Sequence, residues 1–245
     1  MRTQASIHGG FRPGFTLTEM LVVIAIVGIL ASLTLPALSS AKTKVKIKMA
    51  KSEMDLLISA IHAYENEYNR LPLSKEAEQS TTESSPDFTF GTMLRDGTVL
   101  GNVAITNSGN MSYQNCNSEL IAILTDKDVY PNENHSLNPR RETFFQAKEA
   151  KNNSSPGIGA DGILRDPWGN PYIITLDVSD DNKCQDGFYY QLTKGGKNLL
   201  VPGRAIVWSL GPDGKADSSR ERSLDPGKVG LDKVGSNKDN VVSWE

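Results

Sequence analysis

The side chains most often used in catalysis are scattered along this chain. The three histidines, His8, His62 and His135, lie in separate parts of the sequence, so no spacing assigns them to one metal centre. No HExxH zinc motif and no G-x-S-x-G nucleophile turn occurs, and Gly9-Gly10 lacks the surroundings of a phosphate-binding loop. We therefore predict that the protein is not an enzyme. A site built on a pair of carboxylates is the least favoured alternative.

Four aspartates gather around Cys184 in the sequence. They are Asp177, Asp180, Asp181 and Asp186. Their spacing is not that of a calcium-binding EF-hand loop, and the glutamate that closes such a loop is missing. We expect these side chains to lie on a solvated hairpin turn.

Another carboxylate, Glu19, stands directly before a long uncharged segment. Residues 20–41 are 22 residues without a charge, and 16 of them are hydrophobic. A carboxylate at the edge of such a segment is unfavourable unless it is paired. Its presence therefore indicates a specific partner for Glu19.

The uncharged segment has the length of a membrane-spanning helix. At a rise of 1.5 Å per residue, 22 residues make a helix of roughly 33 Å, which is enough to cross a hydrocarbon core once. A cleaved secretory signal fits less well, because the apolar run exceeds a signal core and contains Pro36. We predict a transmembrane helix over residues 15–41.

The chain as a whole has the composition of a soluble globular protein. The 245 residues include 38% hydrophobic and 22% charged side chains, with a net charge of −3. This composition excludes a disordered chain, a collagen-like fibre and a protein with many membrane spans. A negative net charge gives no nucleic-acid footprint, and two cysteines do not make a disulfide-rich scaffold.

An apolar stripe continues the first helix beyond the uncharged segment. Apolar residues recur at steps of three and four, which is one face of a helix. The stripe consists of Ala50, Met54, Leu57, Ile58, Ile61, Tyr64 and Tyr68. We expect the helix to reach about Arg70 and to end before Pro72. Residues 42–72 are therefore predicted to be an amphipathic continuation that packs on its own domain.

The middle of the chain, residues 73–162, has weaker signals and is expected to be rich in loops and short helices. Residues 74–86 are rich in Ser, Thr and Glu, which predicts a surface loop. Residues 86–116 have no clear period and receive no assignment.

Two short helices are expected in this middle region. The first covers residues 118–126, with Ser118 as its N-cap. The second covers residues 140–151, with Phe144 and Phe145 facing inward.

Strand signals are confined to residues 163–245. Short β-branched or aromatic segments bounded by turn residues occur at residues 172–178, 187–192 and 205–210. Their short connections favour an antiparallel meander. One long helix packed on such a sheet defines an α+β fold.

The junction before the uncharged segment carries a specific motif. It reads Gly14-Phe15-Thr16-Leu17-Thr18-Glu19. This resembles the class III leader junction of type IV pilins and type II secretion pseudopilins. The resemblance implies that a prepilin peptidase removes residues 1–14, cutting after Gly14, and methylates Phe15. It also implies that Glu19 meets the Phe15 amine of a neighbouring subunit during assembly. The sequence departs from the family in having Pro13, and no basic residue, directly before Gly14.

Three later segments resemble the major pseudopilins of type II secretion, in the same order. They are Asp166-Pro167-Trp168-Gly169-Asn170-Pro171-Tyr172, Ser209-Leu210-Gly211-Pro212-Asp213-Gly214-Lys215 and Asp239-Asn240-Val241-Val242-Ser243-Trp244. The helix end Asn69-Arg70-Leu71-Pro72 is similar as well. The resemblance implies a type IV pilin-like fold, in which the transmembrane helix later becomes the core of a filament.

The same resemblance implies a structural Ca²⁺ ion in the C-terminal loop. Its ligands would be the backbone carbonyls of Leu210 and Lys215 and the side chains of Asp213, Asp239 and Asn240. Asn240 stands where the family has a second acid, which would weaken the affinity for Ca²⁺. Further acids in the long intervening loop are possible substitutes: Asp217, Asp225 and Asp232. The alternative is an ordinary turn at Asp213-Gly214.

The two cysteines, Cys116 and Cys184, would be carried into an oxidising space by translocation. A bridge between them would stabilise the fold by about 4 kcal/mol through loop closure. We predict this disulfide; the sequence leaves two free thiols as the alternative.

These observations predict a single-pass inner-membrane protein with its body in the periplasm. The five lysines after the span, Lys42, Lys44, Lys46, Lys48 and Lys51, oppose this orientation by the positive-inside rule, but long domains translocate despite flanking charge. The resemblance implies a pseudopilus subunit whose partners are copies of itself, minor pseudopilins, a prepilin peptidase, an assembly platform with its ATPase, and the bilayer before assembly. The alternatives are a type IV or minor pilin for adhesion, motility or DNA uptake, and a tethered periplasmic binding module that never polymerises.

Overall fold

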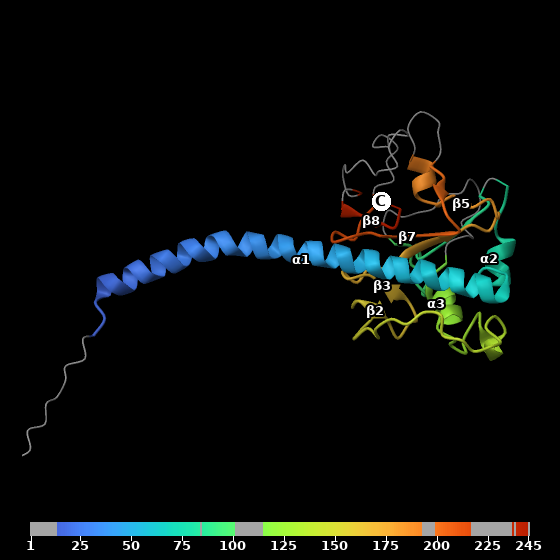
Figure 1. Cartoon of the computed structure of the whole chain (residues 1–245), viewed down its shortest axis with the longest axis horizontal. Helices are drawn as coiled ribbons and strands as arrows, with labels where there is room; N and C mark the ends of the chain where they lie inside the picture. Colours follow the sequence, from blue (N-terminus) through green and yellow to red (C-terminus); the bar gives the residue numbers. More distant parts are fainter. Residues whose placement is uncertain are drawn as a thin grey trace, which may run out of the picture. The chain divides into compact units, whose positions relative to one another are not determined.

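The structure is a computed structural model. It describes residues 14–83, 85–100, 115–192, 199–216, 237 and 239–244, without the side chains of residues 33–37, 39, 191 and 192. The chain forms two compact units, Met1–Lys44 and Val45–Glu245, and we call the second unit the body. Figure 1 shows the elements in chain order.

Helix α1 (Leu17–Tyr68) has 52 residues and contributes to both units. It ends because Asn69 adopts a positive φ of 55° while its amide still bonds to the Glu65 carbonyl at 2.7 Å. A left-handed residue at this position terminates a helix. The helix therefore ends two residues before the expected limit at Arg70.

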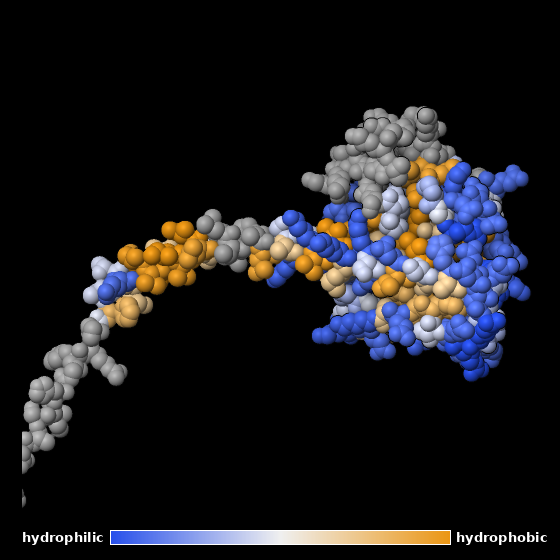
Figure 2. All heavy atoms as spheres, viewed as in Figure 1, coloured by the Kyte–Doolittle hydropathy of each residue, from blue (hydrophilic) through white to orange (hydrophobic). Residues whose placement is uncertain are grey.

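The part of α1 in the first unit exposes its apolar side chains. The large hydrophobic residues described between Phe15 and Leu30 are 47% to 82% exposed. Figure 2 shows hydrophobic side chains along this part of the helix. In the portion of the chain with described side chains, no helix has the length and apolar character to span a membrane.

The part of α1 in the body buries the predicted stripe. Ala50, Met54, Leu57, Ile61 and Tyr64 are fully buried, which confirms the face read from the sequence. The remaining members, Ile58 and Tyr68, are partly buried against the same core.

A four-stranded antiparallel sheet forms the centre of the body. Its strands are β1 (Phe88–Phe90), β4 (Ile173–Leu176), β7 (Ala205–Ser209) and β8 (Val241–Val242), in the order β1-β4-β7-β8. The register pairs Phe90 with Ile174, Ile174 with Val207, and Trp208 with Val242. The fold is therefore α+β, with an N-terminal helix on a small antiparallel sheet, as expected for a type IV pilin-like fold.

Alternate residues of the strands enter two different cores. Ile174, Leu176 and Val207 pack in the larger core with α1. Ile173 and Trp208 point to the other face, where Phe188, Tyr189 and Leu210 cover them. Alternation of side chains across a strand produces this division.

Two of the three expected strands are confirmed as β4 and β7, and the third is wrong. The segment predicted as a strand at residues 187–192 contains η3 (Tyr189–Leu192), a 3₁₀ helix. Its start is fixed by Asp186, whose Oδ1 accepts from the amides of Phe188 at 3.0 Å and Tyr189 at 2.8 Å. The antiparallel meander is confirmed in its strand order, because β1, β4, β7 and β8 follow one another across the sheet as they do in the chain. The additional strand β1 comes from the region left unassigned.

The middle of the chain corrects two further expectations. The expected surface loop contains a short helix, α2 (Lys75–Gln79), capped by Ser74. The helix expected at residues 140–151 is absent from that segment, because the amides of Phe144 and Phe145 both bond to the carbonyl of Leu124. Phe145 is nevertheless buried, as predicted.

Helix α3 (Ser118–Leu124) confirms the other short helix, but Ser118 is not its cap. Asn117 occupies that position. Its side-chain Nδ2 joins α3 to β3 and to the residue before β4, because it donates to the carbonyls of Leu164 at 2.9 Å and Tyr172 at 2.8 Å. The described body also contains one 3₁₀ helix and two strand pairs: η2 (Glu133–His135), β2 (Gly157–Ile158) with β3 (Leu164–Arg165), and β5 (Lys183–Cys184) with β6 (Val201–Pro202).

Candidate assembly and metal-binding sites

Glu19 belongs to a capping box at the start of α1. The amide of Thr16 donates to Glu19 Oε2 at 2.8 Å, and the amide of Glu19 donates to Thr16 Oγ1 at 3.2 Å. This reciprocal pair satisfies two of the donors that a helix start leaves free, and the carboxylate lies near the positive end of the helix dipole. The sequence reading missed this role, although Thr16-Leu17-Thr18-Glu19 has the S/T-x-x-E signature.

Gly14 and Phe15 precede the helix in residues without secondary structure. Phe15 is 79% exposed, and a Cβ added at Gly14 would meet nothing within 4 Å. A protease that needs an accessible backbone would therefore meet no steric obstacle from described residues at this bond. Cleavage after Gly14 and methylation of Phe15 stay predictions.

Two of the predicted calcium ligands, Asp213 and Asp239, meet near the end of the β7–β8 ladder. The amide of Asp213 donates to Asp239 Oδ2 at 3.2 Å, and the amide of Lys215 donates to Asp213 Oδ1 at 2.9 Å. Gly211 has a φ of 67°, and a Cβ there would lie 2.1 Å from the Asp239 carbonyl. The turn after β7 therefore lies directly against residues 239–240.

Two features of this turn favour a cation. Burial, and then the nearby charge of Asp213, raise the pKa of Asp239 above its usual value. Asn240 donates through Nδ2 to the Tyr189 hydroxyl at 2.6 Å, while its Oδ1 is buried and has no hydrogen-bond partner. The site thus holds two carboxylates that repel each other and one unused amide oxygen.

The described residues contain no group of three or more His, Cys, Asp or Glu side chains placed to hold a metal. The candidate set has only two carboxylates, so its other ligands would be an amide oxygen and two backbone carbonyls. The possible substitutes Asp217, Asp225 and Asp232 lie outside the described residues.

The turn at Asp166 is hydrogen-bonded to the turn that follows β7. Asp166 Oδ1 accepts from the amides of Trp168 at 2.8 Å and Asn170 at 2.9 Å, and its Oδ2 accepts from Ser209 Oγ at 2.5 Å. Asn170 Nδ2 then donates to the Gly211 carbonyl at 2.8 Å. Burial raises the pKa of Asp166 despite these bonds. Residues 166–172 and 209–215, both singled out in the sequence, are therefore joined by hydrogen bonds in the structure.

The solvated turn expected for the four aspartates is wrong for two of them. Asp177 and Asp186 are fully buried. Asp186 Oδ2 accepts from Trp208 Nε1 at 3.0 Å and from Thr175 Oγ1 at 2.7 Å, while Asp177 Oδ2 pairs with Arg204 at 2.7 Å. These carboxylates are structural acceptors, which a spacing argument could not distinguish from surface charge.

The predicted disulfide is also wrong, because Cys116 and Cys184 are both free and buried. The Cys116 sulfur contacts Ser118 Oγ at 2.7 Å, beside α3. The Cys184 thiol lies in β5 and donates to the Gly203 carbonyl at 3.3 Å. Burial raises the pKa of Cys184 well above its usual value, so this thiol resists ionisation.

The N-terminal region of the chain is similar to known proteins. Residues 12–35 match the prokaryotic N-terminal methylation motif. Over its N-terminal region the chain is 43% identical across 70 residues to type II secretion system core protein G of Pectobacterium carotovorum subsp. carotovorum, covering 28% of this chain and 45% of that protein. It is 37% identical across 71 residues to core protein G of Escherichia coli K12, covering 29% and 49%.

A third relative is the competence protein ComGC of Halalkalibacterium halodurans, at 36% identity across 64 residues, covering 26% of this chain and 63% of that protein. The chain spans about half the length of the core G proteins it matches. No solved structure matches the chain.

Proposed function

We propose that this chain is a structural subunit of a pseudopilus that drives protein export by type II secretion. The observation that carries the proposal is the N-terminal methylation motif, which extends into a helix whose first part exposes apolar side chains. The similarity to core G proteins supports it. The subunit acts mechanically and performs no catalysis.

In this proposal the chain starts as a single-pass inner-membrane protein with its body in the periplasm. A prepilin peptidase cuts after Gly14 and methylates Phe15. Residues 15–41, which include the apolar first part of α1, lie in the bilayer before assembly and in the filament core afterwards. Copies of the chain add through head-to-tail contacts, which generate open filaments instead of closed rings. Minor pseudopilins, an assembly platform and an ATPase complete the machinery.

Glu19 guides the subunit into register. In apolar surroundings an ammonium and a carboxylate are each costly alone and gain from docking together. The capping box supports this role, because it holds the Glu19 carboxylate beside the Thr16 amide, one residue from Phe15. A neighbouring Phe15 amine would then meet a carboxylate of fixed position.

Three variants separate processing, capping and charge. Gly14→Val should block removal of residues 1–14, measured by mass spectrometry of the N-terminus. Glu19→Gln keeps hydrogen-bonding capacity at the capping position and removes the charge, so it should leave cleavage intact and abolish filaments seen by electron microscopy. Thr16→Ala is the matched control, because it weakens the cap and retains the charge. Normal filaments from Glu19→Gln would contradict the proposed role of the carboxylate.

A second candidate function is a subunit of a pilus-like filament for DNA uptake, which the similarity to a competence protein favours. Deleting the gene discriminates the two, since one loses protein export and the other loses transformation. A tethered module that never polymerises would produce neither filaments nor cross-links between copies.

We further propose a structural Ca²⁺ ion held by Asp213, Asp239, Asn240 and the carbonyls of Leu210 and Lys215. The unused Asn240 oxygen and the opposed carboxylates support it. Hard oxygen donors of this kind suit Ca²⁺, which would tie the turn after β7 to residues 239–240.

Calcium should raise the melting temperature of the full chain relative to EDTA. At 100 times the dissociation constant the gain is about 2.7 kcal/mol, or roughly 5 to 10 °C. Asp213→Asn should abolish most of it, whereas Asp55→Asn, an exposed acid on α1, should not. The gain should shrink as pH falls toward the raised pKa of Asp239, because protonation removes a ligand charge. Equal melting in Ca²⁺ and EDTA would exclude the site.

A further inference from the structure

One side of α1 leaves apolar side chains exposed near the start of the body. Val45, Met49 and Leu56 are 56%, 50% and 58% exposed. Steps of four and seven residues place these three side chains on the same side of a helix. We call them the outer face of α1, because the buried stripe of the same helix packs on the sheet.

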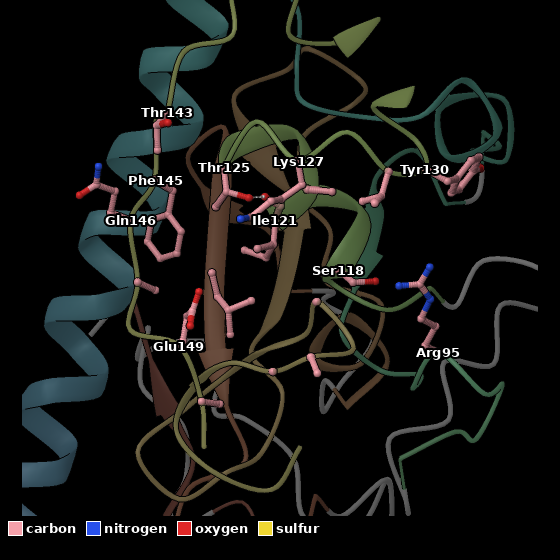
Figure 3. A pocket seen from close by; sticks show the side chains of 18 residues that line it. Arg95, Ser118, Ile121, Thr125, Lys127, Tyr130, Thr143, Phe145, Gln146 and Glu149 are labelled. Carbon is pink, nitrogen blue, oxygen red and sulfur yellow. Dashed lines mark hydrogen bonds between the residues drawn. The ribbon is translucent and has the colours of Figure 1, made fainter. Parts of the chain in front are cut away.

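A second exposed apolar set lies in the loop after α3. Val129 and Tyr130 are 46% and 45% exposed, and we call these two residues the rim patch. They border a pocket of about 730 Å³ between α3 and residues 143–150, and Figure 3 shows Tyr130 at the edge of this pocket. Among the described residues of the body, one further large hydrophobic side chain is exposed, that of Leu200.

Hydrogen bonds fix the rim patch to the end of α1. Asn132 is fully buried, and its amide donates to the Val129 carbonyl at 2.7 Å. Its Oδ1 accepts from the amides of Leu137 at 3.1 Å and Asn138 at 2.9 Å. The Leu137 carbonyl accepts in turn from the hydroxyl of Tyr64 on α1 at 2.5 Å. A loop held in this way loses little conformational freedom when it binds a partner.

The two apolar sets lie too far apart to cover each other within one copy. From Met49 to Tyr64, 64 − 49 = 15 residues of α1 rise by roughly 22 Å. Tyr130 lies beyond that point, because its hydroxyl contacts Glu76 of α2, the helix that follows the end of α1 (Figure 1). Unlike surfaces at two ends of one body are what a head-to-tail contact between copies joins.

The charges around the two sets are opposite. Residues 46–51 contain three lysines and no acid: Lys46, Lys48 and Lys51. Around the rim patch, residues 75–78 and 126–133 carry five acids and two lysines, a balance of 2 − 5 = −3. Complementary charge of this kind steers two surfaces together and fixes their register. The surface that best complements the outer face of α1 is therefore present on the chain itself.

We propose that the rim patch of one copy docks on the outer face of α1 in a second copy. Tyr130 packs against Met49 and Leu56 of that copy. Lys48 faces Glu76 across the same contact, so the apolar and the charged groups are both paired. This inference rests on the proposed filament function and specifies the surfaces through which two bodies meet.

Cysteine cross-linking of the full chain, in its own cells where the assembly machinery is present, tests the contact. Met49→Cys combined with Tyr130→Cys should give a ladder of disulfide-linked multimers in non-reducing electrophoresis. Either substitution alone should give no cross-linked dimer, because the contact joins unlike surfaces. Leu200→Cys with Tyr130→Cys is the matched control and should cross-link at least about tenfold less. Cys116 and Cys184 do not interfere, because both are buried.

A charge exchange tests whether the pairing is specific. Lys48→Glu, added to the cysteine pair, should reduce the cross-linked fraction at least about tenfold, because acids then oppose acids. Adding Glu76→Lys as well should restore the ladder. Lys48 and Glu76 are both exposed, so neither change disturbs the core, and the melting temperature of the unassembled chain should stay unchanged.

The outcomes separate the docking from the filament function. Filaments of the parent chain without a ladder from the cysteine pair would overturn the docking and leave the filament function standing. A ladder without filaments would support the docking and contradict the filament function. Cross-linked dimers from Tyr130→Cys alone would show a symmetric contact and overturn the proposal. If a polarity-sensitive dye on Met49→Cys is shielded in phosphatidylglycerol nanodiscs and exposed in filaments, the outer face meets lipid and not a second copy.

Discussion

The two parts of α1 treat apolar side chains in opposite ways. In the first unit, Ile24 and Ile29 are 64% and 62% exposed, whereas Met54 and Ile61 in the body are fully buried. Both parts are helical, so helix formation does not decide burial. The second part packs on a sheet of the body, whereas the first part leaves its apolar side chains exposed among the described residues. One helix can therefore combine a buried stripe with an exposed apolar part.

The largest expected effect contrasts matched isoleucines in the two parts. Ile61→Ala should destabilise the body by about 3 kcal/mol, because it leaves a cavity in the core. Ile26→Ala should change this stability by less than about 0.5 kcal/mol, since Ile26 is exposed. Guanidinium unfolding of both variants in one detergent, followed by tryptophan fluorescence, measures the difference. Equal losses would show that the two parts do not differ as described.

A smaller effect tests how the second part is attached through charge. Arg204 donates to Glu65 of α1 at 2.6 Å and to buried Asp177 at 2.7 Å. Arg204→Ala should cost about 2 kcal/mol, because both carboxylates lose a charged partner. Asp180→Asn is the control: Asp180 also pairs with Arg204 but is 83% exposed, so solvent already screens it. Asn tolerates the positive φ of 63° at this position. Urea unfolding should show a larger loss of stability for the Arg204 variant than for the control. An Arg204→Ala variant as stable as the parent chain would show that the ion pairs of Arg204 do not help to attach α1.

The smallest effect concerns one hydroxyl between α1 and the sheet. Tyr172 donates to Glu53 Oε2 at 2.5 Å, and burial raises the pKa of Glu53 despite this bond. Tyr172→Phe should cost about 1 kcal/mol at neutral pH, where Glu53 is ionised. Without the hydroxyl the pKa of Glu53 rises further, so the cost should shrink as pH falls through its titration.

Unfolding at pH 7.5 and at about pH 4 checks this expectation. Tyr130→Phe is the control, because its hydroxyl is exposed and its contact with Glu76 is long, at 3.3 Å. A cost that grows toward low pH would contradict the assigned protonation of Glu53.

The sequence predicted the elements whose signals are local and periodic. The stripe of α1 follows directly from apolar spacing, and β4 and β7 follow from β-branched runs. The segments that failed are controlled by single polar contacts. Asp186 turns an aromatic run into η3, and the Leu124 carbonyl holds the amides of Phe144 and Phe145 away from helix bonding.

The candidate sites were predictable only in part. The calcium-type residues Asp213 and Asp239 were named from resemblance, and the β7–β8 pairing places them together. The missing disulfide shows the limit, because two cysteines in one chain carry no information about their distance. The pocket between α3 and residues 143–150 could not be predicted for the same reason, since its walls come from segments that only tertiary packing brings together.

The contacts that attach α1 to the rest of the body also affect the rate of folding. The contact of Tyr172 with Glu53 spans 119 residues, and that of Arg204 with Glu65 spans 139. Such long loops must close before the contacts form, which slows folding. Until they close, the second part of α1 presents its apolar stripe to solvent just as the first part does. A newly made chain is therefore most prone to aggregate before residues 172–209 reach the helix, and we expect its folding to depend on protection during that interval.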